Sequence, residues 1–140
     1  METDGFETGF KGRLTSWLSF NINYTYTHSI EKGAGRLPDV PLHQANFSLG
    51  TNNDIGKYLC LYTALNARYS GETTYVDSMT GTTIEELDDF TVMDLVLRLS
   101  ILEKHIVKFA MYNILDEEYQ VHGSNLGPER YYWVGVEATF

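Results

Sequence analysis

The segment from Arg130 to Phe140 alternates between two kinds of residue with a period of two. Apolar or aromatic side chains occupy every second position, at Tyr132, Val134, Val136, Ala138 and Phe140. Successive side chains of a strand point to opposite faces, so this pattern predicts a strand with one apolar and one mixed-polar surface. Its length suits a strand that crosses a lipid bilayer, which needs about 9–11 residues.

The same alternation recurs along the whole chain and predicts an all-β fold. The three prolines lie between the alternating segments, as expected for a residue that cannot donate a ladder hydrogen bond. The seven predicted strands are Gly5–Leu14, Trp17–His28, His43–Gly50, Tyr58–Ser70, Phe90–Ile101, His105–Tyr112 and Tyr131–Phe140.

Short and long connections between these strands alternate strictly. The short ones are residues 15–16, 51–57 and 102–104, and the long ones are residues 29–42, 71–89 and 113–130. In an antiparallel sheet this order places every long loop at one end and every short turn at the other. Transmembrane barrels share this asymmetry, with tight periplasmic turns and longer outside loops. We therefore predict an antiparallel up-and-down transmembrane β-barrel portion.

The two faces of the predicted strands differ sharply in charge. No Asp, Glu, Lys or Arg falls on the apolar face, although 21% of the chain is charged. The charged residues of the opposite face are Glu7, Lys11, Arg13, Arg68, Asp94, Arg98, Lys108 and Glu137. Such a sheet can turn its apolar face either to lipid or to the interior of a soluble barrel that binds an apolar ligand. Tyrosines near the long-loop ends, including Tyr24, Tyr26 and Tyr69, resemble a membrane aromatic belt and favour lipid.

The composition of the chain argues against several classes of function. The net charge of −9 argues against a nucleic-acid partner, because phosphate binding needs a basic surface. Cys60 is the single cysteine, which excludes an intrachain disulfide and a thiolate cluster. The four histidines lack metal-site spacing, and no Gly-x-Ser-x-Gly occurs. No signal peptide and no transmembrane helix are recognisable. We expect no enzymatic activity, no cofactor and no metal site.

Several short motifs together resemble a known family. The block from Asn113 to Tyr119 resembles the Asn-Leu-Phe-Asp-x-x-Tyr block of TonB-dependent outer-membrane receptors, and Pro128 and Arg130 match two residues of the Pro-Gly-Arg that follows it. Leu37–His43 is similar to the family's Leu-Pro-x-x-Pro-x-His segment. The openings Gly5-Phe6-Glu7 and Tyr24-Thr25-Tyr26 also resemble family strands.

This resemblance implies a bacterial outer-membrane receptor that imports a scarce nutrient, most often a ferric siderophore and otherwise cobalamin or a similar compound. Complete members have a barrel of about 22 strands with a plug in its lumen. Residues 1–140 would be the C-terminal part of such a barrel, without the plug domain and the signal peptide. Its implied partners are outer-membrane lipid, the barrel-assembly machinery, the nutrient, and the TonB complex through the missing N-terminal part.

Two sets of candidate functional residues follow. In the resembled family, the terminal strand acts as a signal for the barrel-assembly machinery, which here would be Tyr132, Val134, Val136, Ala138 and Phe140. Cationic and aromatic residues in or beside the outside loops could contact a siderophore. These possible ligand contacts are Arg36, Tyr75, Tyr119, His122 and Arg130.

Overall fold

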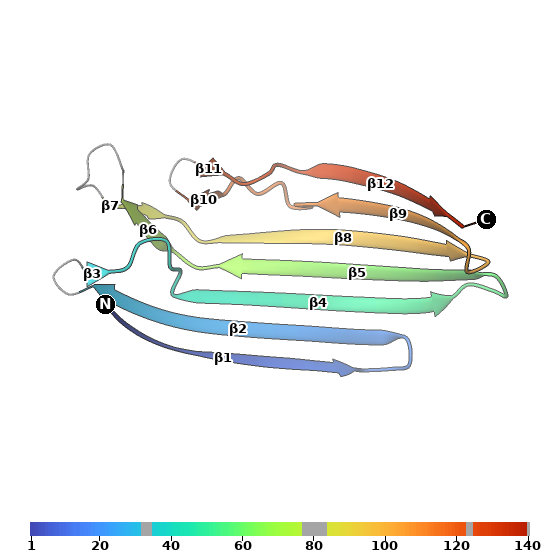
Figure 1. Cartoon of the computed structure of the whole chain (residues 1–140), viewed down its shortest axis with the longest axis horizontal. Coiled ribbons are helices and arrows are strands. Elements are labelled where there is room, and N and C mark those ends of the chain that lie inside the picture. The colour runs from blue at the N-terminus through green and yellow to red at the C-terminus, as the bar shows by residue number, and fades with distance from the viewer. Residues whose placement is uncertain (32–34, 77–83, 123–124, 140) are drawn as a thin grey trace.

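The computed structural model describes residues 1–31, 35–76, 84–122 and 125–139. Its main sheet contains seven long strands that are hydrogen-bonded in chain order (Figure 1). These strands are β1 (Glu2–Arg13), β2 (Leu18–Glu31), β4 (His43–Asp54), β5 (Leu59–Ser70), β8 (Phe90–Ile101), β9 (His105–Tyr112) and β12 (Tyr131–Ala138). Every neighbouring pair is antiparallel. The predicted antiparallel all-β fold is confirmed.

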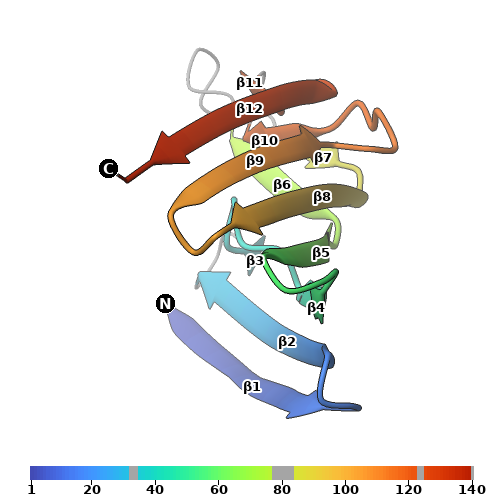
Figure 2. The ribbon, with the colours of Figure 1, turned by 90° about the vertical axis from the view of Figure 1, so that its right-hand side faces the viewer.

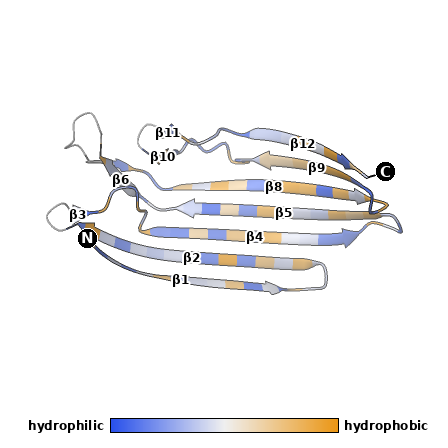
Figure 3. Cartoon of the chain, viewed as in Figure 1, coloured by the Kyte–Doolittle hydropathy of each residue, from blue (hydrophilic) through white to orange (hydrophobic). Residues whose placement is uncertain are grey.

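The strand register brings residues of one kind into rows across the sheet. One row joins Phe20, Leu49, Leu65, Leu95 and Met111 through successive strand pairs. A parallel row on the other face joins Asn21, Ser48, Asn66 and Asp94. A shift of one residue would move a whole strand's apolar set to the wrong face, so this pattern fixes the register. Figure 3 shows the resulting alternation of hydropathy along β4, β5 and β8.

The observed strands extend or shorten the predicted ones by a few residues. The neighbouring strands Phe90–Ile101 and His105–Tyr112 have the predicted bounds. β4 continues to Asp54, where a turn was expected, because residues 51–54 still pair with β5. The long loops contain short strands that the alternation did not predict. These are β3 (Gly35–Arg36), β6 (Thr73–Val76), β7 (Ile84–Leu87), β10 (Gln120–His122) and β11 (Asn125–Leu126).

The two ends of the sheet differ as the loop lengths predict. The short turns all lie at one end, and the loops that carry β3, β6, β7, β10 and β11 lie at the other (Figure 1). The N-terminus lies at the long-loop end and the C-terminus at the short-turn end. The sheet is bent into an arc (Figure 2), and loop residues meet its polar face on the inside of that arc.

The apolar face of the sheet is exposed rather than packed into a core. Phe10 is 67% exposed and Val136 75% exposed. The few buried apolar side chains of the long strands, Ala64, Val92 and Ala110, lie instead on the polar face. A water-soluble barrel would enclose its apolar face, whereas a membrane barrel turns it outward. Among the described residues, no helix is long and apolar enough to cross a membrane.

The sheet is open at both edges. Over the described residues, β1 pairs only with β2 and β12 pairs only with β9. Because neighbours alternate in direction, the first and seventh long strands run the same way. An antiparallel barrel therefore cannot form by joining β1 to β12, and each edge keeps a row of unpaired backbone groups that lipid cannot satisfy.

Candidate ligand-binding site at the loop end of the polar face

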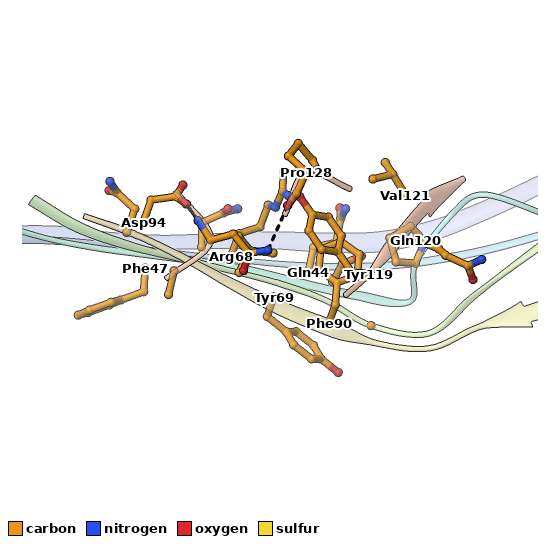
Figure 4. A pocket seen from close by; sticks show the side chains of 18 of the residues that line it. Gln44, Phe47, Arg68, Tyr69, Phe90, Asp94, Tyr119, Gln120, Val121 and Pro128 are labelled. Atoms are coloured by element: carbon orange, nitrogen blue, oxygen red, sulfur yellow. Dashed lines mark hydrogen bonds between the residues drawn. The ribbon is translucent and has the colours of Figure 1, made fainter. Parts of the chain in front are cut away.

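A pocket of about 830 Å³ lies where the polar face of the sheet meets the long loops (Figure 4). Its floor comes from the outer halves of β4 and β5 and the start of β8, and its walls come from residues of all three long loops. Phe47 and Tyr69 point to the opposite side of the sheet in Figure 4. The polar-face and loop residues that define the pocket include Gln44, Asn46, Asn66, Arg68, Ser70, Phe90, Asp94, Asp39, Tyr119 and Gln120.

Arg68 is the cation of this pocket. Its guanidinium carbon lies 5.7 Å from the ring centre of Phe90 and 6.0 Å from that of Tyr119. These two rings contact each other, with centroids 4.5 Å apart and planes inclined by 34°. Tyr119 is only 7% exposed. The aromatic pair therefore forms a fixed support beside the guanidinium, which is a favourable position for a cation.

Gly127 gives Tyr119 the space that it occupies. A Cβ atom added at Gly127 would collide with the Tyr119 ring. The Gly127 N–H also donates to the Tyr119 carbonyl at 2.8 Å, so the two segments lie against each other. In this chain the glycine stands before Pro128, not after it as in the Pro-Gly-Arg of the resembled family, and it has a packing role.

Asn113 anchors the segment that leads to Tyr119. It is only 2% exposed, and its φ of 50° is one that Asn tolerates better than most residues. Its side-chain amide donates to the carbonyls of Glu117 (2.9 Å) and Pro128 (3.1 Å), and its Oδ1 accepts the Glu117 N–H at 3.0 Å. Its own N–H donates to Asp94 Oδ1 at 2.9 Å. Asn113 therefore joins the strand wall, the turn that follows it and the return to β12.

Asp116 fastens the same loop at a second point. Its Oδ1 accepts the Arg130 N–H at 3.0 Å, and its Oδ2 lies 3.5 Å from an Arg130 guanidinium nitrogen. The three matching positions of the 113–119 block, Asn113, Asp116 and Tyr119, therefore each make a contact that shapes this loop. The sequence identified the block, but it did not indicate these contacts.

Contacts between separate loops complete the outer rim. Asp39 Oδ1 lies 2.6 Å from His122 Nδ1, and the Asp39 N–H donates to the Thr74 carbonyl at 2.7 Å. Arg36 donates to the carbonyls of Glu72 (2.9 Å) and Val40 (3.3 Å). The three long loops are thereby joined to one another.

A sheet with one exposed apolar face, one polar inner face and one end closed by long loops is the wall of a transmembrane barrel. The sequence model described as "TonB dependent receptor-like, beta-barrel" matches residues 1–114. The chain belongs to this family. The predicted family, the fold class and the location in the bacterial outer membrane are confirmed.

Named relatives of this TonB-dependent receptor barrel are iron-related outer-membrane proteins. The iron-regulated outer membrane virulence protein of Vibrio cholerae serotype O1 is 27% identical over 147 residues, which cover 99% of this chain and 22% of the relative. The chain thus spans about a fifth of the length of that protein.

Solved structures share the fold. The ferripyoverdine receptor of Pseudomonas aeruginosa superposes with a TM-score of 0.77 and 17% identity, over 97% of this chain and 19% of that one. The ferric yersiniabactin uptake receptor of Yersinia pestis gives a TM-score of 0.75 and 20% identity, over 99% of this chain and 23% of that one.

The structure distributes the predicted site residues of this receptor barrel over two regions. Tyr132, Val134, Val136 and Ala138 lie on the outward face of β12, and Phe140 lies outside the described residues. Arg36, Tyr75, His122 and Arg130 lie in or beside the joined loops, whereas Tyr119 is buried against Phe90. Sequence reasoning did not select Arg68 as a site residue. Its one available signal was a charge on the predicted polar face, near the end of a strand that enters a long loop.

Proposed function

We propose that this chain is the C-terminal barrel segment of a TonB-dependent receptor that imports a ferric siderophore across the outer membrane. The observation that carries the proposal is the polar pocket, which lies on the inner face of a family barrel wall beneath joined outer loops. A pocket at this end meets ligand arriving from outside the cell. The iron-related names of the relatives support the ligand class.

The remaining parts of such a receptor lie outside these 140 residues. In this proposal, a preceding plug domain fills the lumen and makes the contact with the TonB complex, and further strands pair with β1 and β12. The segment itself contributes wall and loops and has no catalytic role.

Five loop residues, Arg36, Tyr75, Tyr119, His122 and Arg130, are proposed to form the ligand-facing rim. His122 and Arg130 are partly exposed, so their side chains can reach a ligand. Tyr119 contributes from beneath, because its ring is buried and supports Arg68.

The terminal strand is proposed to be the part that the barrel-assembly machinery reads. Tyr132, Val134, Val136 and Ala138 lie on its outward face as a lipid-facing strand requires, and Phe140 continues the same alternation in the sequence. In the full-length receptor, Phe140→Ala should lower the yield of heat-modifiable barrel in the outer membrane. An unchanged yield would contradict this assignment.

Uptake of radioactive iron tests the transport proposal. The gene that carries this segment is deleted in its host, and cells grown under iron limitation are supplied with ⁵⁵Fe bound to a siderophore of the host's medium. We expect uptake to fall in the deletion strain and to return when the complete gene is restored. Normal iron uptake together with loss of cobalamin uptake would instead assign the receptor to cobalamin.

A further inference from the structure

Arg68 is an exposed cation on the wall of this pocket, and it lacks an anionic partner in the part of the chain that the structure describes. No hydrogen bond or ion pair there engages its guanidinium, whose recorded contacts are the rings of Phe90 and Tyr119. A guanidinium has five N–H donors and normally binds carboxylate or a similar anion through two of them. Stacking on an aromatic ring leaves these donors at the edge of the group available.

Three carboxylates line the pocket, those of Asp39, Asp88 and Asp94, and two of them have other partners. Asp94 Oδ1 accepts the backbone N–H of Asn113, and Asp39 Oδ1 contacts His122. The residue paired with Arg68 on β4 is Asn46, and its partner on β8 is Val92. Both side chains are uncharged, so neither cross-strand neighbour compensates the charge of Arg68.

The rings beside Arg68 are held in place by a chain of contacts from the loop. Gly127 admits the Tyr119 ring, and the ring of Tyr119 packs on Phe90. Asn113 then holds the segment before Tyr119 against Asp94 and Pro128. A preorganised cation loses less conformational freedom when it binds, which raises affinity.

We propose that Arg68, supported by Phe90 and Tyr119, binds an anionic oxygen group at the loop end of the lumen. The group would be a carboxylate or the chelating oxygen of a negatively charged iron complex. It can come from an incoming ligand, in which case the inference rests on the proposed function, or from an acidic side chain of a plug domain inside the barrel.

The decisive comparison is Arg68→Gln against Arg98→Gln in the full-length receptor, held in outer-membrane vesicles. Arg98 is also an exposed arginine of the polar face, and it makes no ring contact with the described residues. Two probes are used: a tricatecholate iron complex, which is anionic, and a trihydroxamate iron complex, which is neutral. If the ligand supplies the anion, Arg68→Gln weakens binding of the anionic complex about 10- to 100-fold. Binding of the neutral complex, and both affinities of Arg98→Gln, change little.

Limited proteolysis of the plug tests the second source. If a plug carboxylate occupies the site, Arg68→Gln leaves both affinities unchanged and makes the plug more easily cleaved than in Arg98→Gln. Arg68→Lys keeps the charge without the planar fork, so it should give an intermediate effect in whichever measurement responds.

The inference is overturned if Arg68→Gln matches Arg98→Gln in both affinities and in plug cleavage. Failure of the wild-type receptor to bind either complex would count against the proposed function for these ligand classes. Plug cleavage would still decide the role of Arg68 in that case.

Discussion

The two ends of this sheet differ in the length of their connections and in the contacts that hold them. At the short-turn end, the chain reverses over a few residues, and Leu102 and Glu103 adopt φ values of 54° and 57°. At the long-loop end, the chain makes buried hydrogen bonds, ring contacts and contacts between loops. A pocket of about 530 Å³ lies between two of the short turns, and the long-loop end builds the larger one, of about 830 Å³. In this barrel wall, specific side-chain contacts are concentrated where ligand is expected to arrive.

The largest effect is expected at Asn113. Asn113→Ala leaves the Glu117 and Pro128 carbonyls and the Glu117 N–H without their partner, and puts alanine at a φ of 50°. We expect a loss of about 3 kcal/mol of stability in the loop, since a buried group without its partner costs about 1–3 kcal/mol. Limited proteolysis of the outside loops measures it.

Asn53→Ala is the matched control for that change. Asn53 lies near the short-turn end of β4 and makes no hydrogen bond through its side chain with the described residues. It should leave cleavage of the outside loops unchanged. Equal effects of the two substitutions would show that the two ends do not differ as described.

A smaller effect is expected from two glycines that serve different purposes. Gly127→Ala places a methyl group against the Tyr119 ring and should displace that ring, at a cost of about 1–3 kcal/mol. Gly56→Ala meets no neighbouring atom but must adopt a φ of 137°. The affinity of the receptor for its ligand, measured by the quenching of the receptor's intrinsic fluorescence on binding, reports the outcome. Only Gly127→Ala should change affinity. An effect of Gly56→Ala on affinity would contradict the view that only the long-loop end shapes the ligand site.

Substitutions in the turn at Leu102 and Glu103 should raise the stability of the barrel. The Lys104 N–H donates to the Ile101 carbonyl at 3.1 Å across two residues of positive φ, a geometry that favours Asn-Gly. Leu102→Asn combined with Glu103→Gly should stabilise the barrel by about 1 kcal/mol. A higher temperature for the heat-modifiable gel shift, with unchanged ligand affinity, is the expected result. A lower temperature would contradict the strain argument.

The smallest effect is expected at the pair of His122 and Asp39. Both side chains are largely exposed, so solvent screens the pair and its contribution is about 0.2–1 kcal/mol. A double-mutant cycle of His122→Ala and Asp39→Ala, read by loop proteolysis at low and high salt, measures the coupling. The coupling should fall as salt rises. A coupling well above this range and insensitive to salt would mean that the contact is not a surface ion pair.

Much of the wall could be predicted from the sequence alone. Alternation in β8 and β9 gave the observed bounds, because a strand with one apolar face must repeat every second residue. The short strands in the loops were not predictable in this way. β6 and β7, for example, have only four residues each, too few for a periodic signal.

Part of the candidate site could likewise be predicted from the sequence, and part could not. Asn113, Asp116 and Tyr119 stood out as a block, and the structure supplied their contacts with Asp94, Pro128 and Arg130. Arg68 and Arg98 are both charges on the polar face of a strand, and the sequence separates them only by the length of the loop that follows each strand. The ring contacts that distinguish Arg68 come from the packing of a distant loop onto β5 and β8.

The sequence by itself determined the strands, their faces and the asymmetry of the loops, because these follow from the two-residue period of the backbone and from loop length. Tertiary structure decided which polar residues meet across the sheet, and that Tyr119 lies beside Arg68. Those contacts join positions far apart in the chain. They depend on strand register and on how the loop after β9 folds back, which no short sequence window records.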